Sequence, residues 1–291
     1  MTEIIASPST RRMARDQNVD IDNLARKLGR TTIGPEDIAA KSGAAPTGDI
    51  GYWDVDHSQY GPVTEEPMSR FAQVAARNMA AAQSLIPAVT HHDRADIRAV
   101  ERLRSSLRSQ ADARGVKLTA LAFHVAALAR GLRKFPRFNT SLSPDGQTLV
   151  LKGYIHIGIA VDTPHGLMVP VIRDADHKGL WQIAAEIADL AARAQARKVT
   201  PDQMGGASMT ITNLGGIGGT AFTPIVNPPE VAILGITRTE TVTVWDGETP
   251  RPVPMVPLDL SYDHRVINGA DAARFMAHYC SLIGDPRNML I

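Results

Sequence analysis

A histidine near the end of a predicted strand, His264, has the residue type and the setting of a general base. An alternating apolar run leads up to it and predicts a half-buried strand: Val256, Leu258, Leu260 and Tyr262. Asn268 and Gly269 follow, and then a helical pattern begins. Imidazole titrates near neutral pH, so a histidine at such a rim can take a proton from a thiol or hydroxyl nucleophile. A satisfied structural histidine fits this run equally well.

A hydroxyl at the end of another predicted strand, Thr212, is suited to stabilise an oxyanion. Residues 208–212 read as a strand that enters the glycine-rich bend 215–219. A hydroxyl where a strand meets a bend can donate to a developing negative charge. The bend lacks the Lys-Ser/Thr ending of a phosphate-cradling loop, and its glycine spacing does not match a dinucleotide loop. Its glycines therefore indicate tight turns or close backbone approach.

Other reactive side chains give weaker patterns. No Gly-x-Ser-x-Gly elbow occurs, which argues against a serine hydrolase. His91, His92 and Asp96 have ligand-type side chains, but adjacent histidines on a strand point to opposite faces, so we expect no metal. The single cysteine, Cys280, is expected to be a buried thiol, because it falls on an apolar stripe of the terminal helix: Ala273, Met276, Cys280 and Ile283.

Composition favours a soluble cytoplasmic protein. The 291 residues carry 31 basic and 30 acidic side chains, and a net charge of +1 gives no electrostatic reason to expect nucleic acid. No apolar stretch has the length of a membrane span, and no signal-peptide pattern is present, so we expect no membrane partner.

The elements that must position these residues fall into three zones. Residues 6–40 read as a small two-helix module, with helices near 11–15 and from 34 onward and a loop between them, and residues 41–65 read as a linker. Residues 66–291 read as one α/β domain of the α+β type, without the regular βαβ repeat of Rossmann or TIM folds. Its predicted helices cover about 67–85, 97–107, 118–133, 180–194 and the C-terminus. Its predicted strands cover 88–92, 149–162, 167–172, 208–212, 230–237 and 256–262.

Several segments, taken in order, resemble the 2-oxo acid dehydrogenase acyltransferases, the dihydrolipoamide acyltransferase components of these complexes. Asp263–Ala270 resembles their His-x-x-x-Asp-Gly signature, which chloramphenicol acetyltransferase shares, with Asn268 at the aspartate position. The segments 86–90, 135–139, 158–172, 212–215 and 224–235 agree as well, so the resemblance covers roughly 55–291. Residues 218–227 look most like the acetyl-transferring pyruvate dehydrogenase branch. The resemblance implies a chloramphenicol acetyltransferase-like catalytic domain with a mixed sheet and packed helices.

The resemblance also implies a mechanism and its residues. His264 is expected to deprotonate the thiol of coenzyme A or of dihydrolipoamide, and Thr212, from across a subunit boundary, to hydrogen-bond the oxyanion. Asn268 is expected to orient groups beside His264. Asp162 and Asn213 are candidates for substrate contacts, with a structural role for Asp162 equally open. Coenzyme A or acetyl-CoA is then a substrate, and no metal is implied.

Assembly and partners follow from the same resemblance. A trimer is implied, in which channels between subunits hold the active sites, and trimers can build a larger cubic or icosahedral core. Residues 6–40 resemble the peripheral subunit-binding domain, although the stretch 26–33 departs from the family pattern. The expected partners are a thiamine-dependent dehydrogenase, dihydrolipoamide dehydrogenase, or both. Arg11, Arg12 and Arg15 are candidates for docking an acidic surface, with a solvated basic face equally open.

A second departure from the family pattern leaves alternative functions open. The sequence carries no Asp-Lys-Ala turn of a lipoyl domain. If the sequence is full length, we expect the lipoyl group to be supplied in trans by a separate lipoyl protein, and if it is a fragment, nothing follows from the absence. In the full-length case that absence favours a second hypothesis, a non-catalytic scaffold that tethers a partner enzyme, while His264 and Thr212 oppose it. A third hypothesis is an acetyltransferase acting on a free small molecule.

Overall fold

The protein was analysed as a computed structural model that divides into two units, residues 1–67 and 68–291. It describes residues 55–289 and, before them, residues 4, 6, 10, 11, 14, 15, 19–28 and 31–33. The division lies two residues from the predicted start of the catalytic domain at 66. Most of the predicted linker, the second predicted helix of the module and Arg12 lie outside the described residues.

The first unit contains a helix where a loop was expected. Helix α2 (Ile21–Leu28) begins at Asp20, whose carboxylate accepts the backbone N–H groups of Asp22 and Asn23 at 2.9 and 3.1 Å. Arg26 and Lys27 lie in its last turn, where positive charge favours the helix dipole. The loop prediction was wrong because it overlooked this cap. Leu24 and Ala25 join Ala14 and Ile33 in a small apolar cluster.

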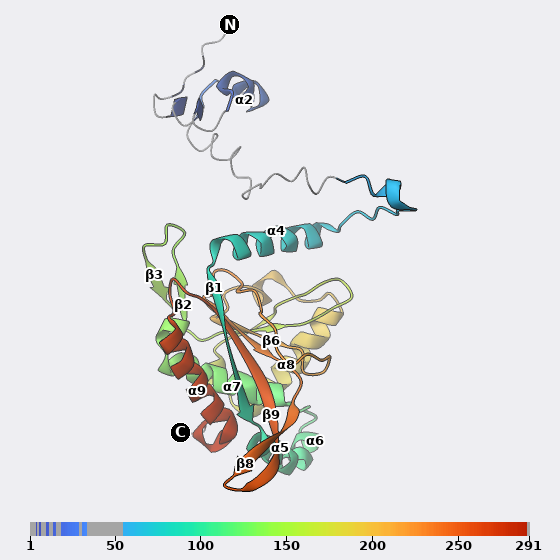
Figure 1. The fold of residues 1–291 in the computed structure, drawn as a ribbon, viewed down its shortest axis with the longest axis vertical. Helices are drawn as coiled ribbons and strands as arrows, with labels where there is room; N and C mark the ends of the chain where they lie inside the picture. Colours follow the sequence, from blue (N-terminus) through green and yellow to red (C-terminus); the bar gives the residue numbers. More distant parts are fainter. Residues whose placement is uncertain are drawn as a thin grey trace. The chain divides into compact units, whose positions relative to one another are not determined.

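A mixed sheet forms the centre of the second unit (Figure 1). Within residues 55–289 it has seven strands in the order β1-β9-β7-β6-β4-β5, with β8 paired to β9. These strands are β1 (Ala88–Asp96), β4 (Ile157–Ala160), β5 (Val171–Ile172), β6 (Met209–Asn213), β7 (Ala232–Ile236), β8 (Glu240–Asp246) and β9 (Thr249–Asp263). The pairs β4–β6 and β6–β7 are parallel and the others are antiparallel, so the predicted mixed sheet is confirmed.

One predicted strand, over 149–162, is broken in the structure. Only β3 (Leu149–Leu151) and β4 are strands, and β3 pairs with β2 (Thr140–Leu142) in a separate small sheet. The amide of Asn139 explains the break, because it donates to the carbonyls of Lys152 and Tyr154 at 3.1 and 2.7 Å. These carbonyls are thus satisfied outside a strand ladder. The strand predicted over 167–172 is likewise reduced to β5.

The helices described in the second unit are α4 (Arg70–Leu85), α5 (Arg98–Ser106), α6 (Arg108–Ala113), α7 (Ala120–Lys134), α8 (Leu180–Gln195) and α9 (Gly269–Gly284), with short 3-10 helices at 136–138, 175–177, 201–203 and 286–289. A further short 3-10 helix, at 57–60, belongs to the first unit. Helix α9 packs on β1, and α7 contacts both α8 and α9. The predicted burial of the segment 118–133 is confirmed, because α7 is buried on most sides. No helix in the described part of the chain is both long and apolar enough to cross a membrane.

The buried face of α9 contains most of the predicted stripe and two aromatic residues besides. Met276 and Ile283 are buried as predicted and Cys280 is partly buried, whereas Ala273 is exposed. The Phe275 ring stacks on Phe138 with ring centres 4.2 Å apart, and the buried Tyr279 hydroxyl lies 2.7 Å from His124 Nδ1. These two large side chains widen the buried face beyond the predicted stripe and leave Ala273 at its exposed edge.

Candidate active site

His264 sits on a tightly held turn between β9 and α9. Its backbone N–H donates to the Pro87 carbonyl at 3.1 Å, which ties the turn to the start of β1. Within the turn the carboxylate of Asp263 accepts hydrogen bonds from Arg265, with an Nη2–Oδ2 distance of 2.7 Å, and Val266 and Ile267 are buried. The His264 side chain itself is exposed. The turn therefore presents an imidazole to solvent on a rigid backbone.

Asn268 is the N-cap of α9. Its side-chain oxygen accepts the backbone N–H of Asp271 at 2.8 Å, so the amide satisfies one of the free donors of the first turn. The same residue thus joins the His264 turn to the helix behind it. The side-chain NH2 group of Asn268 remains a donor on the exposed side of the turn.

Thr212 lines a large cavity of the second unit. The cavity has a volume of about 620 Å³ and lies between α4, the ends of β4 and β6, and the segment 222–227. Phe71, Val74, Leu167, Phe222, Ile225 and Ile233 give it apolar walls. A hydroxyl in such a cavity interacts strongly with developing charge, because little water competes for it.

His264 and Thr212 of one chain are far apart. Thr212 pairs with Gly235, which pairs with Asp259, and His264 lies five residues beyond Asp259 along the chain. At typical strand dimensions the two residues are about 17 Å apart along the strands and about 10 Å apart across them. A reacting carbonyl must approach both groups to about 3 Å. The two side chains of one chain therefore do not form one site.

The remaining predicted site residues lie elsewhere. Asn213 follows Thr212 but lines a different cavity of about 290 Å³, where its side-chain oxygen accepts the Gly215 N–H at 2.9 Å. Successive side chains of a strand point to opposite faces, which explains the separation. Asp162 is exposed beyond β4, and its backbone carbonyl accepts a hydrogen bond from Gln195. Neither residue lines the Thr212 cavity.

The thiol of Cys280 is unsuited to act as a nucleophile. Burial, together with the neighbouring Asp93 carboxylate, raises the pKa of Cys280 to about 12. A thiol with so high a pKa holds almost no thiolate at neutral pH. Within the described residues, no group of three or more His, Cys, Asp or Glu side chains could hold a metal ion.

A buried carboxyl group beside the Thr212 cavity escaped the sequence analysis. Glu230 is only 5% exposed, and its Oε1 accepts hydrogen bonds from Thr210 at 2.9 Å and from Asn227 at 3.3 Å. Thr210 and Asn227 both line the cavity. Burial raises the pKa of Glu230 to about 7, against the two hydrogen bonds and the charge of Lys152, which lower it. Its place at the start of the predicted strand 230–237 gave no sign that its carboxyl group is buried beside a cavity.

Comparison with known proteins identifies the family of the chain. Residues 60–291 match the model of the 2-oxoacid dehydrogenases acyltransferase family (catalytic domain). The chain belongs to this acyltransferase family. Over 99% of its length it is 45% identical to the dihydrolipoyllysine-residue acetyltransferase component of the pyruvate dehydrogenase complex of Pseudomonas aeruginosa, and it covers 55% of that protein. The chain spans about half the length of this relative and of three other curated relatives that it matches.

Solved structures of this acyltransferase family share the fold. The dihydrolipoamide acetyltransferase of Azotobacter vinelandii is 50% identical with a TM-score of 0.80, covering 81% of this chain and 98% of that one. That structure was determined to study the role of a serine, a histidine and an asparagine in catalysis, and these are 52 and 4 residues apart. The structure of the cubic core of a pyruvate dehydrogenase multienzyme complex is 51% identical, with the same TM-score and coverage.

Proposed function

We propose that this acyltransferase moves an acetyl group between coenzyme A and a dihydrolipoyl thiol in a pyruvate dehydrogenase complex. One observation carries the proposal. Thr212, His264 and Asn268 have the separations of 52 and 4 residues found for the serine, histidine and asparagine studied in the 50% identical acetyltransferase. Threonine here keeps the hydroxyl of that serine. The curated relatives carry the same activity in their names.

The reaction follows from ordinary thioester chemistry. The His264 imidazole takes the proton of the attacking thiol, whose unperturbed pKa of about 8.5 requires only a modest base near neutral pH. The thiolate adds to the acetyl carbonyl, and the Thr212 hydroxyl donates to the oxyanion. The intermediate then expels the other thiolate, which takes the proton back from the imidazolium. No metal takes part in these steps.

We propose further that each active site combines His264 of one copy with Thr212 of another. The distance between the two residues along and across the sheet supports this arrangement. An exposed apolar surface on α4, including Phe71, Val74 and Leu85, offers area for contact between copies. Trimers that build a larger core are the assembly we expect, in keeping with the cubic core of the 51% identical relative.

Turnover of free dihydrolipoamide with acetyl-CoA tests the proposed activity. The His264→Ala variant is expected to lose about 10²- to 10⁴-fold in kcat, because it lacks the base. Thr212→Val is expected to lose about 10²- to 10³-fold, because it lacks one oxyanion donor. Light scattering should show both variants assembled as the wild type.

The same assay separates the alternatives. If the wild-type assembly does not acetylate dihydrolipoamide, the proposal is contradicted and the non-catalytic scaffold remains. If it acetylates only a hydroxylated small molecule, the proposal is contradicted in favour of an acetyltransferase for a free small molecule.

A further inference from the structure

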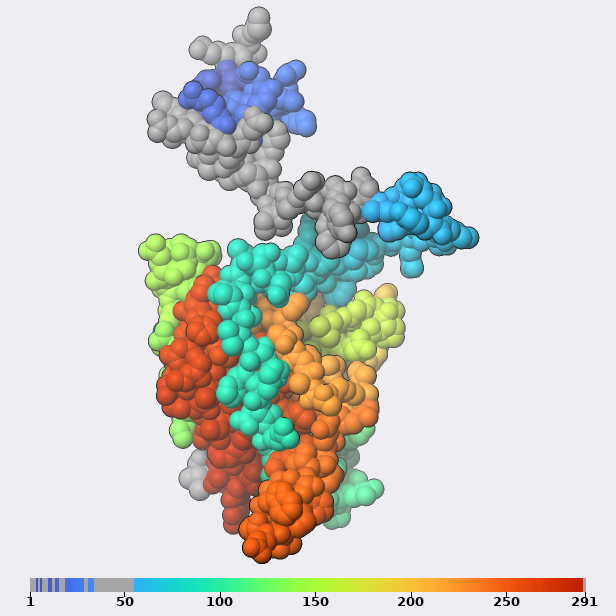
Figure 2. All heavy atoms as spheres, in the orientation of Figure 1, coloured from blue at the N-terminus to red at the C-terminus, as the bar shows by residue number. Residues whose placement is uncertain are grey.

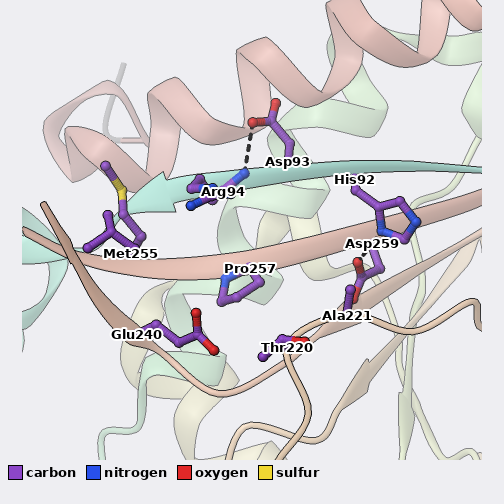
Figure 3. A pocket seen from close by; sticks show the side chains of 10 residues that line it. His92, Asp93, Arg94, Thr220, Ala221, Glu240, Met255, Pro257 and Asp259 are labelled. Atoms are coloured by element: carbon purple, nitrogen blue, oxygen red, sulfur yellow. Dashed lines mark hydrogen bonds and ion pairs between the residues drawn. The ribbon is translucent and has the colours of Figure 1, made fainter. Parts of the chain in front are cut away.

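A buried carboxylate and a surface histidine form a pair on the sheet face opposite α9. His92 Nδ1 lies 2.6 Å from Asp259 Oδ1, and the two side chains are 53% and 1% exposed. Figure 3 shows the imidazole of His92 beside this carboxylate, with Thr220 and Ala221 next to them. In the space-filling view, β1 (teal) lies at the surface between α9 (red) and the segment that contains β8 and β9 (orange) (Figure 2). Neither residue belongs to the proposed reaction.

The second oxygen of the same carboxylate holds the backbone of a cavity wall. Asp259 Oδ2 accepts the N–H of Phe222 at 3.3 Å. A carboxylate buried to this degree is costly unless donors satisfy its oxygens, so the N–H of Phe222 and the imidazole are both needed. Removing the imidazole leaves one oxygen without a donor, and the carboxylate must then shift or recruit water.

Phe222 connects this pair to Thr212. Gly235 lies between Thr212 and Asp259 in the cross-strand register, and the Phe222 ring packs over it. A Cβ atom on Gly235 would lie 2.7 Å from two ring atoms, so the glycine is needed for the ring to fit. Phe222 and Thr212 line the same cavity of about 620 Å³. A displacement of the carboxylate is therefore transmitted to the wall beside the Thr212 hydroxyl.

We infer that His92 and Asp259 are a positioning pair for the acetyl-transfer site. They fix Phe222, and Phe222 fixes the cavity wall against which the acyl group and the Thr212 hydroxyl are aligned. This inference rests on the proposed oxyanion role of Thr212. The pair acts through Phe222 and does not touch the reacting atoms.

Two substitutions of the exposed His92 test the inference in the assembled protein. His92→Leu removes the donor and is expected to lower kcat for acetyl transfer to dihydrolipoamide about tenfold, with little change in KM, because a misplaced donor slows chemistry more than binding. His92→Asn places an amide near the position of Nδ1 and is expected to stay within about twofold of wild type. Thr90→Val is the matched control, because it removes only the 2.8 Å hydrogen bond to Ser261 between the same two strands.

A double-mutant cycle gives the decisive readout. If the pair acts through Thr212, His92→Leu combined with Thr212→Val is expected to be within about twofold of Thr212→Val alone. Phe222→Leu, which removes the ring, should reproduce the His92→Leu defect and should not add to it.

The inference would be overturned if the losses in kcat of His92→Leu and Thr212→Val multiply in the double variant. It would also be overturned if His92→Asn is as slow as His92→Leu. Full activity of Thr212→Val is a separate outcome. It contradicts the oxyanion role in the proposed function, and the inference is overturned with it.

Discussion

At the scale of single residues, the groups of the proposed site differ in how their surroundings hold them. The His264 side chain is exposed, but its backbone N–H donates to Pro87, and its neighbours Asp263, Val266 and Ile267 are buried. Glu230 is the reverse case, since its carboxyl group is buried and its Oε2 has no hydrogen-bond partner. An ionised carboxylate with a bare buried oxygen is unfavourable, which accounts for its raised pKa.

Glu230 makes stability depend on pH. Its pKa is about 7 in the folded protein against an ordinary value of 4.5, so the folded state holds the proton more tightly. Its contribution is fully present below about pH 4.5 and is lost as pH rises through 7. Between pH 4.5 and 8 the free energy of unfolding of the uncharged Glu230→Gln variant should therefore fall less than that of the wild type, by on the order of 3 kcal/mol.

Thermal unfolding of the assembled protein at several pH values checks this expectation. The exposed carboxylate variant Glu248→Gln serves as the control and should keep the wild-type slope. A Glu230→Gln slope equal to that of the control contradicts the assignment.

At the scale of elements, α9 and the strand before it place the base. Asn268 begins α9, and β9 ends at Asp263, so the turn that carries His264 is fixed at both sides by regular structure. The N-terminal half of β9 was not predicted as a strand because of its prolines at 250, 252 and 254. Successive residues of a strand direct their N–H groups to opposite edges. Prolines at every second position therefore remove donors from one edge only, and the other edge keeps its N–H groups and pairs with β8.

The cap of α9 is open to a direct test. Asn268→Ala removes the acceptor for the Asp271 N–H and is expected to cost about 1 kcal/mol of stability. Asn268→Asp keeps an acceptor and should retain the wild-type melting temperature. Activity is expected to fall in the alanine variant, because the His264 turn loses its anchor to the helix. An alanine variant with a lower kcat and an unchanged melting temperature would show that Asn268 acts by another route.

At the scale of the whole molecule, the proposed site needs more than one copy of the chain. The distance along and across the sheet keeps His264 from Thr212 of the same chain. If each site takes its base from one copy and its hydroxyl from the next, two inactive variants can complement each other. In a mixed assembly of His264→Ala and Thr212→Val chains, about a quarter of the sites contain both functional groups.

Co-refolding the two variants in equal amounts measures this complementation. Activity is expected to rise to about a quarter of wild type, while each variant refolded alone stays inactive. A mixture no more active than its components contradicts a shared site and requires both groups to come from one chain.

Local pattern was enough to single out candidate groups and to predict much of the scaffold. The helices α4, α7 and α8 were predicted from periodicity and turn residues, which act over a few positions. The roles proposed for His264 and Thr212 needed the family resemblance as well. The break in the strand predicted over 149–162 depends on the Asn139 amide. Helix α2, which occupies part of the predicted loop between the two helices of the module, depends on the cap at Asp20.

The sequence by itself determined which groups are proposed for the chemistry, since the residue types of His264, Thr212 and Asn268 and their spacing are properties of the linear chain. Only the tertiary structure decided how those groups are distributed. Strand register places Thr212 in one row with Gly235 and Asp259, joins Asp259 to His92 across 167 residues, and keeps His264 at a distance. Register depends on contacts between distant segments, which no local pattern records.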